Sequence, residues 1–290
     1  MGYLRDKYTR AYFLGSTSTT GKPVGVAGYE EFRLGGIAPR FVGYLRVTAA
    51  EIGGFCRKSV LDIGCGRGEM LYLSLGSDAA HVVGIDFSRA ALDIVTSWIQ
   101  SDRLQLLQQE ANSITFDAEF DVVFLLDVVE HIPRWEINEV YARARKSLRH
   151  GGVVVVHTPL FRTSDEHDCT AGVPEVEGMH CNKQTFAKLL GACRRHSMVP
   201  VAFRDDVFVL RRAEDCSLSQ RIRATIVIEW HGFSRTLRRF RGTLRQRAAQ
   251  VVRLILRRGP GCAIRVFFAH GSPLWRAGKR DKPQRGQSPH

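Results

Sequence analysis

The chain has 290 residues, 44% hydrophobic and 24% charged, which suits a globular protein with a sizeable core. No run of 18 or more apolar residues occurs, so no membrane-spanning helix is expected. The seven cysteines are odd in number and form no Cys-x-x-Cys pair, and the charged N-terminus does not resemble a signal peptide, so we expect a reducing cytoplasm rather than a disulfide framework.

The formal net charge of +13 belongs to the C-terminal part of the chain. From residue 211 onward there are 19 Lys and Arg against 4 Asp and Glu, whereas the first 210 residues are close to neutral. Such a change in charge predicts a boundary. We therefore expect an N-terminal cap segment with a first helix over 1–55, a central domain over 56–212, and a basic helical extension over 213–290 that ends in a disordered tail.

The predicted elements follow one another in a regular order after the N-terminal segment. Residues 1–35 predict two short helices joined by a loop, and a longer helix follows near 37–55. Strands are predicted at 59–63, 81–85, 104–108, 120–126, 152–157, 198–203 and 206–212, and helices at 68–76, 88–100, 133–148 and 182–195. This alternation predicts a doubly wound α/β fold with a mostly parallel sheet of seven strands. The last two strands lie too close in sequence for a crossover, so they form a hairpin and one of them runs antiparallel.

The stretch VLDIGCGRGEM lies where the first predicted strand passes into a helix, and it contains the alternating glycines Gly64, Gly66 and Gly68. Glycines let a backbone pass close to a ligand, and the helix start offers free N–H groups. Glu69 occupies the third glycine position of the dinucleotide fingerprint, which disfavours a dinucleotide. Asp62 would accept hydrogen bonds from a ligand ammonium group but would repel a pyrophosphate. The alternative is a plain tight turn.

The next strand, HVVGID, ends in Asp86, about 20 residues past the glycine turn. An acid at this spacing can bind the hydroxyls of a ribose, and Phe87 beside it can lie against an adenine face. The alternative is that Asp86 caps the helix that starts near Ser88.

Taken in order, VLDIGCGRGEM, VVGIDFS, FDVVFLLDVVEHI and LRHGGVVVVHTP resemble the class I S-adenosylmethionine-dependent methyltransferases, over roughly residues 56–212. The resemblance implies a seven-stranded sheet whose last strand is antiparallel, and S-adenosyl-L-methionine as cofactor. It also assigns residues that hold the methionine part of the cofactor: Asp62, Gly64, the Cys65 backbone, Gly66, the neighbouring Gly68, and Asp127 after the fourth strand. Asp86 would hold the ribose, while Glu110 and Ala111 in QEANSITF would lie at the adenine edge.

Two histidines are candidates for the acceptor side. His131, in DVVEHIP, follows the fourth strand and is a candidate general base; alternatively it caps or packs the helix after Pro133. His180 precedes a helix in the long loop after the fifth strand, which in this family often lines the acceptor site. Tyr12 and Phe13 belong either to a lid over the cofactor or to ordinary packing of the N-terminal segment.

A zinc site would need residue types such as those of His167, Cys169, His180 and Cys181. Their spacing is not that of a zinc finger, so no metal is predicted.

The function predicted from these residues is methyl transfer from S-adenosyl-L-methionine to an O or N atom of a small-molecule or lipid- or glycan-linked metabolite. The motifs that accept a nucleobase amine (N-P-P-Y, D-P-P-Y) and the Pro-Cys nucleophile of cytosine methylation do not occur at their usual places, which favours a metabolite. Two alternatives remain: an RNA or other nucleic-acid methyltransferase that uses the basic extension, and a membrane-associated binding protein with a methyltransferase-like fold.

The basic extension carries apolar residues at helical spacing between Leu237 and Ile255. A helix of this kind packs on the core or on a second subunit, binds an anionic membrane surface, or, less readily, binds nucleic acid. The expected location is cytoplasmic, with peripheral membrane attachment as the variant that the extension would bring about. The oligomeric state is not predicted.

Overall fold

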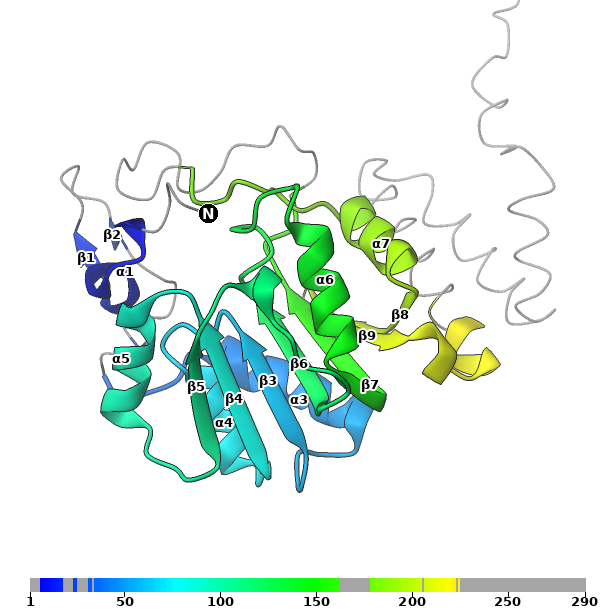
Figure 1. Ribbon diagram of the computed structural model, residues 1–290, viewed down its shortest axis with the longest axis horizontal. Helices are drawn as coiled ribbons and strands as arrows, with labels where there is room; N and C mark the ends of the chain where they lie inside the picture. Colours follow the sequence, from blue (N-terminus) through cyan, green and yellow to red (C-terminus); the bar gives the residue numbers. More distant parts are fainter. Residues whose placement is uncertain are drawn as a thin grey trace, which may run out of the picture. The chain divides into compact units, whose positions relative to one another are not determined.

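The computed structural model describes residues 6–17, 23–24, 31–32, 34–161, 178–204, 206–222 and 224 (Figure 1). All of them belong to one compact unit, Met1–Val227. The predicted helix near residues 237–255 and the tail that follows it lie outside the described residues.

The core of this unit is a sheet of seven strands in the order β5-β4-β3-β6-β7-β9-β8 (Figure 1). The strands are β3 (Ser59–Ile63), β4 (His81–Asp86), β5 (Leu104–Gln108), β6 (Phe120–Leu126), β7 (Leu148–His157), β8 (Met198–Arg204) and β9 (Val207–Arg212). Neighbouring strands pair in parallel except at β9, which is antiparallel to both β7 and β8. The predicted α/β class, the seven strands and the antiparallel last strand are therefore confirmed.

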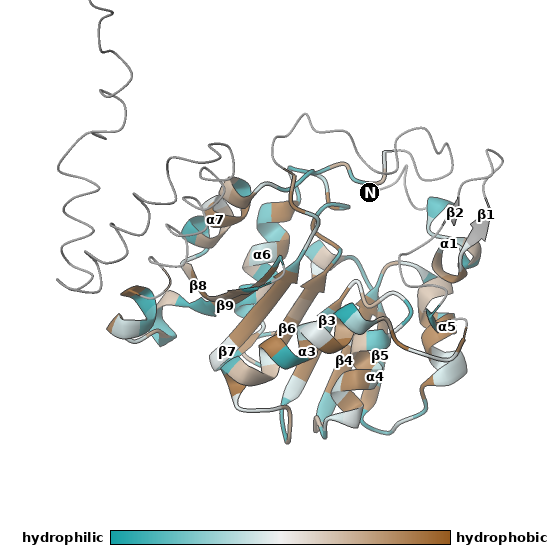
Figure 2. Cartoon of the chain, turned by 180° about the vertical axis from the view of Figure 1, so that it is seen from behind, coloured by the Kyte–Doolittle hydropathy of each residue, from teal (hydrophilic) through white to brown (hydrophobic). Residues whose placement is uncertain are grey.

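Helices cover both faces of the sheet, as Figures 1 and 2 show from opposite sides. Their bounds are α3 (Pro39–Ile52), α4 (Glu69–Gly76), α5 (Arg89–Trp98), α6 (Ile137–Lys146) and α7 (Phe186–Arg195). Alternate side chains of β6 enter opposite cores: Val123 and Leu125 pack with α6 and α7, whereas Phe124 and Leu126 pack with α3 and α4. Because both faces are covered, the central strands are nearly continuous apolar runs, coloured brown in Figure 2.

Three elements begin four residues away from their predicted starts. Strand β7 starts at Leu148, which pairs with Phe120 before a register shift, so the glycines at 151 and 152 lie inside the strand rather than before it. Helix α6 starts four residues late because residues 133–136 form turns. Helix α7 starts at Phe186, where the side chain of Thr185 caps the N–H of Lys188 at 3.3 Å.

The N-terminal segment forms α1 (Arg10–Leu14), capped by Thr9, and a two-stranded antiparallel ribbon of β1 (Ser16–Thr17) and β2 (Pro23–Val24). The ribbon was not predicted, because two-residue strands are too short to show an alternating pattern. Phe13 of α1 is buried against Ala91 and Ile94 of α5, which anchors the segment to the domain.

The described residues after β9 remain bonded to the sheet. The Ala213 N–H donates to the Ser197 carbonyl at 2.8 Å, and the Gly151 N–H donates to the Asp215 carboxylate at 2.9 Å. The domain boundary near residue 212 therefore stays a prediction from charge alone. Among the described residues, no helix has the length and apolar character needed to cross a membrane.

Candidate functional site

The candidate site lies at the edge of the sheet where the parallel strands end. Parallel strands bring their carboxyl ends to one edge, and ligands of open α/β sheets bind there. Four neighbouring strands contribute the loops that carry the predicted residues: Gly64–Gly68 after β3, Asp86–Ser88 after β4, Asp127–His131 after β6 and His157–Thr158 after β7.

The glycine turn is held against the end of β4. The N–H groups of Gly64 and Cys65 both donate to the Ile85 carbonyl, at 2.7 and 3.0 Å, and the Cys65 side chain is buried. Gly64 has φ 75°, and a Cβ there would lie 2.4 Å from the Val128 side chain, so this position requires glycine. These contacts fix the Gly64–Cys65 side of the turn against the end of β4.

Gly68 has a structural explanation of its own. It precedes α4, and a Cβ added to it would lie 3.0 Å from Val95 and 3.2 Å from Ile99, the two neighbours contributed by the α5 region. The residue thus allows close packing of two helices, and its predicted part in cofactor binding remains an expectation.

Asp86 joins the glycine turn to the next strand. Its carboxylate accepts a hydrogen bond from the Gly66 N–H at 3.0 Å and another from the Ser88 N–H at 2.8 Å. Burial raises the pKa of Asp86 to about 6, although the two backbone hydrogen bonds oppose this shift. The bond to Ser88 is local, but the bond to Gly66 links the two motifs that the sequence assigned to one ligand.

Asp62 places a second buried acid below the turn. Burial, followed by the charges of Glu69 and Asp86, raises the pKa of Asp62 to about 8. Glu69 is itself paired with the buried Arg67. The surroundings of the turn therefore favour a ligand that carries positive charge.

The N-terminal segment lies over this acidic turn. The Arg67 guanidinium donates to the Phe13 carbonyl at 3.3 Å, and the Ser88 hydroxyl donates to the Tyr8 carbonyl at 2.8 Å. The Tyr8 ring meets Phe87 edge-on, with centroids 4.9 Å apart. The sequence left two interpretations of this segment, a lid over the cofactor and ordinary packing. Phe13 packs in the core, whereas Tyr8 and Tyr12 face the site residues, so contacts of both kinds occur.

The residues predicted for the adenine edge, Glu110 and Ala111, follow β5, the edge strand of the sheet. Glu110 is followed by the short helix η2 (Ala111–Ser113), and the preceding Gln109 N–H donates to the Asp86 carbonyl at 3.1 Å. The structure thus places Glu110 and Ala111 one strand beyond Asp86, on the side of Phe87.

Asp127 forms an acid–imidazole pair that the sequence did not reveal. Its carboxylate lies 2.5 Å from Nδ1 of His157, at the end of β7, and 3.9 Å from Nε of Arg40. Burial opposes ionisation of Asp127, yet the hydrogen bond with His157 and the charge of Arg40 hold its pKa below its usual value. The sequence could have pointed to His157 as a site residue, because it ends the predicted parallel strand next to β6.

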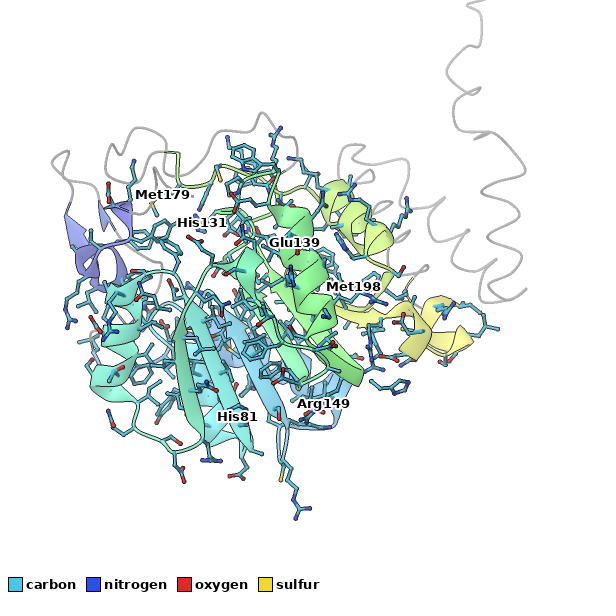
Figure 3. The ribbon with its side chains drawn as sticks, in the orientation of Figure 1. His81, His131, Glu139, Arg149, Met179 and Met198 are labelled. Atoms are coloured by element: carbon cyan, nitrogen blue, oxygen red, sulfur yellow. The ribbon has the colours of Figure 1, made fainter. Side chains whose placement is uncertain are left out.

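His131 and His180 lie together, although they come from loops that are 49 positions apart. Their ring centroids are 4.8 Å apart, and Nδ1 of His131 lies 3.0 Å from the Met179 carbonyl (Figure 3). Glu130, whose side chain is 1% exposed, has Oε1 4.0 Å from Nε2 of His131, while its Oε2 accepts a hydrogen bond from the Thr158 hydroxyl. The Tyr8 ring lies 6.0 Å from that of His131, so one aromatic ring spans from the adenine side to the histidines.

The loop before α7 holds His180 in place through a series of bonds to the sheet edge. The Asn182 N–H donates to the Glu130 carbonyl at 2.9 Å, and the Cys181 thiol donates to the His131 carbonyl at 3.3 Å. Of the zinc-type residues considered from the sequence, His167 and Cys169 lie outside the described residues.

Comparison with known proteins agrees with this geometry. Residues 60–152 match the family model described as a methyltransferase domain. The ubiquinone biosynthesis O-methyltransferases of Azoarcus sp. (strain BH72) and Aromatoleum aromaticum are 37% and 34% identical to the chain over 109 residues. Each alignment covers 36% of this chain and less than half of the relative, 46% and 45% respectively.

A solved structure described as a possible exported protein from Bordetella parapertussis has a similar fold. Its TM-score is 0.50 at 18% identity, with 64% of this chain and 70% of that chain covered. At this identity the similarity shows a shared fold and nothing about activity. The family match, the strand order and the single antiparallel strand together confirm the resemblance that the motifs indicated: residues 60–152 are a methyltransferase domain, carried on the class I methyltransferase fold.

Proposed function

We propose that the protein is an S-adenosylmethionine-dependent methyltransferase that methylates an oxygen atom of a small molecule. The observation that supports this most directly is the hydrogen bond between Gly66 and Asp86, because it joins the glycine turn and the ribose acid into one surface. The two O-methyltransferases that match over the central domain support an oxygen acceptor.

The residues at the turn suit the cofactor's charge. S-adenosyl-L-methionine, when bound, supplies a methyl group activated by a positively charged sulfur. Asp62 would accept from its ammonium group, Gly66 would line its methionine part, and Asp86 would accept from the ribose hydroxyls. Phe87, Glu110 and Ala111 would lie at the adenine. A cationic group beside Asp62 would favour the ionised form of this carboxyl, whose pKa is raised to about 8 in the free protein, and the ionised acids would repel the pyrophosphate of a dinucleotide.

On the acceptor side, the protein's task is to align a hydroxyl with the methyl group and to help it lose its proton. His131 and His180, from the two candidate loops, meet at the sheet edge beside Asp127, and we propose that this pair faces the acceptor. Tyr8, whose ring contacts those of both Phe87 and His131, would exclude water from the reacting atoms.

Titration calorimetry tests the cofactor assignment. Purified protein is titrated with S-adenosylhomocysteine, the demethylated product, and separately with NAD. We expect binding of the first and no binding of the second. Tight binding of NAD without a response to S-adenosylhomocysteine would reject the proposed function.

A finer part of the proposal concerns the acceptor and the extension. The acceptor is lipid- or glycan-linked, and residues 213–290 dock the enzyme on an anionic membrane surface through their excess of 13 positive charges, given by 17 Lys and Arg against 4 Asp and Glu. This part rests on the sequence pattern. Nucleic-acid binding by the same residues is its competitor.

A further inference from the structure

We propose that Glu130, His131 and His180 form a binding site for one divalent transition-metal ion of the Zn²⁺ or Co²⁺ type, which coordinates the hydroxyl of the acceptor. The inference rests on the proposed function for its chemical use, but the site itself is argued from the side chains alone. No metal was predicted from the sequence, where the grouping considered had the wrong spacing and shares only His180 with this cluster.

The first argument is the convergence of three donors. One ligand atom from each of the three residues lies within 4.8 Å of the other two. Donors bound to one such ion lie about 3–4 Å apart, since each metal–ligand bond is about 2.0–2.2 Å long. Movement of the side chains by about 1 Å, within the range that metal binding induces, would close the remaining gap.

The second argument is the orientation of His131. Its Nδ1 lies 3.0 Å from the Met179 carbonyl, and a carbonyl only accepts, so Nδ1 carries the proton. The other nitrogen, Nε2, then presents its lone pair, and this atom lies 4.0 Å from Oε1 of Glu130. A backbone carbonyl that holds one imidazole nitrogen while the other binds the ion is the usual arrangement of metal-binding histidines.

The third argument is the support given to the other two donors. Oε2 of Glu130 accepts from Thr158 at 2.9 Å, which turns Oε1 towards the histidines. The Asn182 N–H bonds the Glu130 carbonyl at 2.9 Å, and the Asn182 side chain bonds the Val129 carbonyl at 3.4 Å. These bonds fasten the loop of His180 to the loop of Glu130 and His131, so the cluster does not depend on an isolated surface contact.

The donor set indicates the kind of ion and its use. Two imidazole nitrogens and one carboxylate suit Zn²⁺, Co²⁺ or Fe²⁺, whereas Mg²⁺ and Ca²⁺ prefer oxygen ligands throughout. With three ligands among the described residues, a position is left for substrate, as in catalytic rather than structural sites. The acceptor class is therefore a hydroxyl compound that can coordinate a metal, above all one with a second oxygen on the neighbouring carbon.

The ion would act as a Lewis acid on the acceptor. The coordinated hydroxyl loses its proton to water, and a lone pair of the oxygen forms the new O–C bond with the methyl carbon. The electrons of the breaking S–C bond return to sulfur, which leaves as the neutral thioether S-adenosylhomocysteine. The metal changes neither its charge nor its ligand set from the protein.

The test uses the full chain after treatment with a chelator. It is titrated with Co²⁺, whose visible absorption reports nitrogen and oxygen ligands, and with Zn²⁺ and Mg²⁺ by calorimetry. The variants are His180→Ala and Glu130→Gln. The control is His81→Ala, an exposed histidine at the start of β4, far from His131 at the other edge of the sheet (Figure 3).

We expect the wild type and the control to bind one equivalent of Co²⁺ and Zn²⁺ more tightly than Mg²⁺. Each site variant should bind Co²⁺ at least tenfold more weakly, with its S-adenosylhomocysteine affinity unchanged. Unaltered Co²⁺ binding in His180→Ala would overturn the proposal. So would a loss of Co²⁺ binding in Cys169→Ala while both site variants still bind the ion, because Cys169 belongs to the other grouping considered from the sequence. If Glu130→Gln fails to fold, the Co²⁺ affinity of His180→Ala still tests the proposal, because residue 180 lies in a loop. Metal binding without S-adenosylhomocysteine binding would reject the proposed function and leave the metal site standing.

Discussion

The carboxylate of Asp86 accepts a hydrogen bond from the backbone N–H of Gly66, and this 3.0 Å contact joins two loops that are 20 residues apart. The same carboxylate is held by Ser88, so its orientation is set before a ligand arrives. A preorganised acid of this kind loses little entropy on binding.

Replacing this acid should weaken cofactor binding. In Asp86→Ala, the ribose hydroxyls lose a charged partner, and we expect a loss of about 1–3 kcal/mol in the binding of S-adenosylhomocysteine. Calorimetry measures the change, and Asp93→Ala, an exposed acid paired with Arg89 on α5, is the matched control. Unchanged affinity in a folded Asp86→Ala protein would mean that the residue only orders the turn.

The affinity for S-adenosylhomocysteine should depend on pH through Asp62. Its pKa in the free protein is raised to about 8 by burial first and by Glu69 and Asp86 next. An ammonium group beside the carboxylate stabilises the ionised form, so the pKa of Asp62 falls on binding. Below about pH 8 binding must then release the Asp62 proton, and affinity rises with pH by up to about tenfold per pH unit until it levels off above that value.

Calorimetry at about pH 7 and pH 8, in buffers of different ionisation enthalpy, would detect this proton release. Asp86, whose pKa is about 6, is largely ionised across that window and adds little to the slope. The variant Asp62→Asn should bind more weakly and lose the slope. An equal slope in the variant would assign the titration to another group.

Two glycines should respond in opposite ways to alanine. Gly64 has φ 75° and a Cβ there would clash with Val128, so Gly64→Ala should lower the free energy of unfolding by about 1–3 kcal/mol. Gly43 lies inside helix α3 with open space around it, so Gly43→Ala should raise the same quantity by about 0.5–1 kcal/mol. Urea unfolding curves provide both values, and a stable Gly64→Ala protein would show that the turn tolerates another backbone path.

Removal of the extension should separate its role from that of the fold. Because residues 213–215 are bonded to the domain, the truncation belongs after Val227, at the boundary between the two compact units. We expect the affinity for S-adenosylhomocysteine to stay within about tenfold, roughly 1.4 kcal/mol, since the site residues all lie earlier in the chain.

The full chain should bind vesicles that contain anionic lipid, and the truncated chain should not. Sedimentation with vesicles and a gel shift with RNA, each at several salt concentrations, would distinguish the two partners. RNA binding without vesicle binding would favour the nucleic-acid alternative. If the truncated protein aggregates, the extension covers apolar surface and is part of the domain.

The sequence by itself was sufficient for the seven strands of the main sheet, for the helices between them and for the fold class. The runs that became β3 and β6 begin and end where they were predicted, because a central parallel strand is apolar on both faces and is bounded by polar or glycine residues. The edge strand β5 also has its predicted bounds, although its residues are only partly buried or exposed. The glycine turn and Asp86 were also found from sequence, since their spacing reflects one strand–helix–strand unit, a local relationship.

Only the tertiary structure decided which side chains meet at the acceptor side. His157 reaches Asp127 because β7 lies beside β6, and His180 reaches His131 because Asn182 fastens a distant loop to the Glu130 backbone. Contacts of this kind depend on which strands are neighbours and on where a long loop crosses the sheet edge. Neither leaves a periodic pattern along the chain. Glu130, His131 and His180 can therefore be recognised as one cluster only in the folded structure.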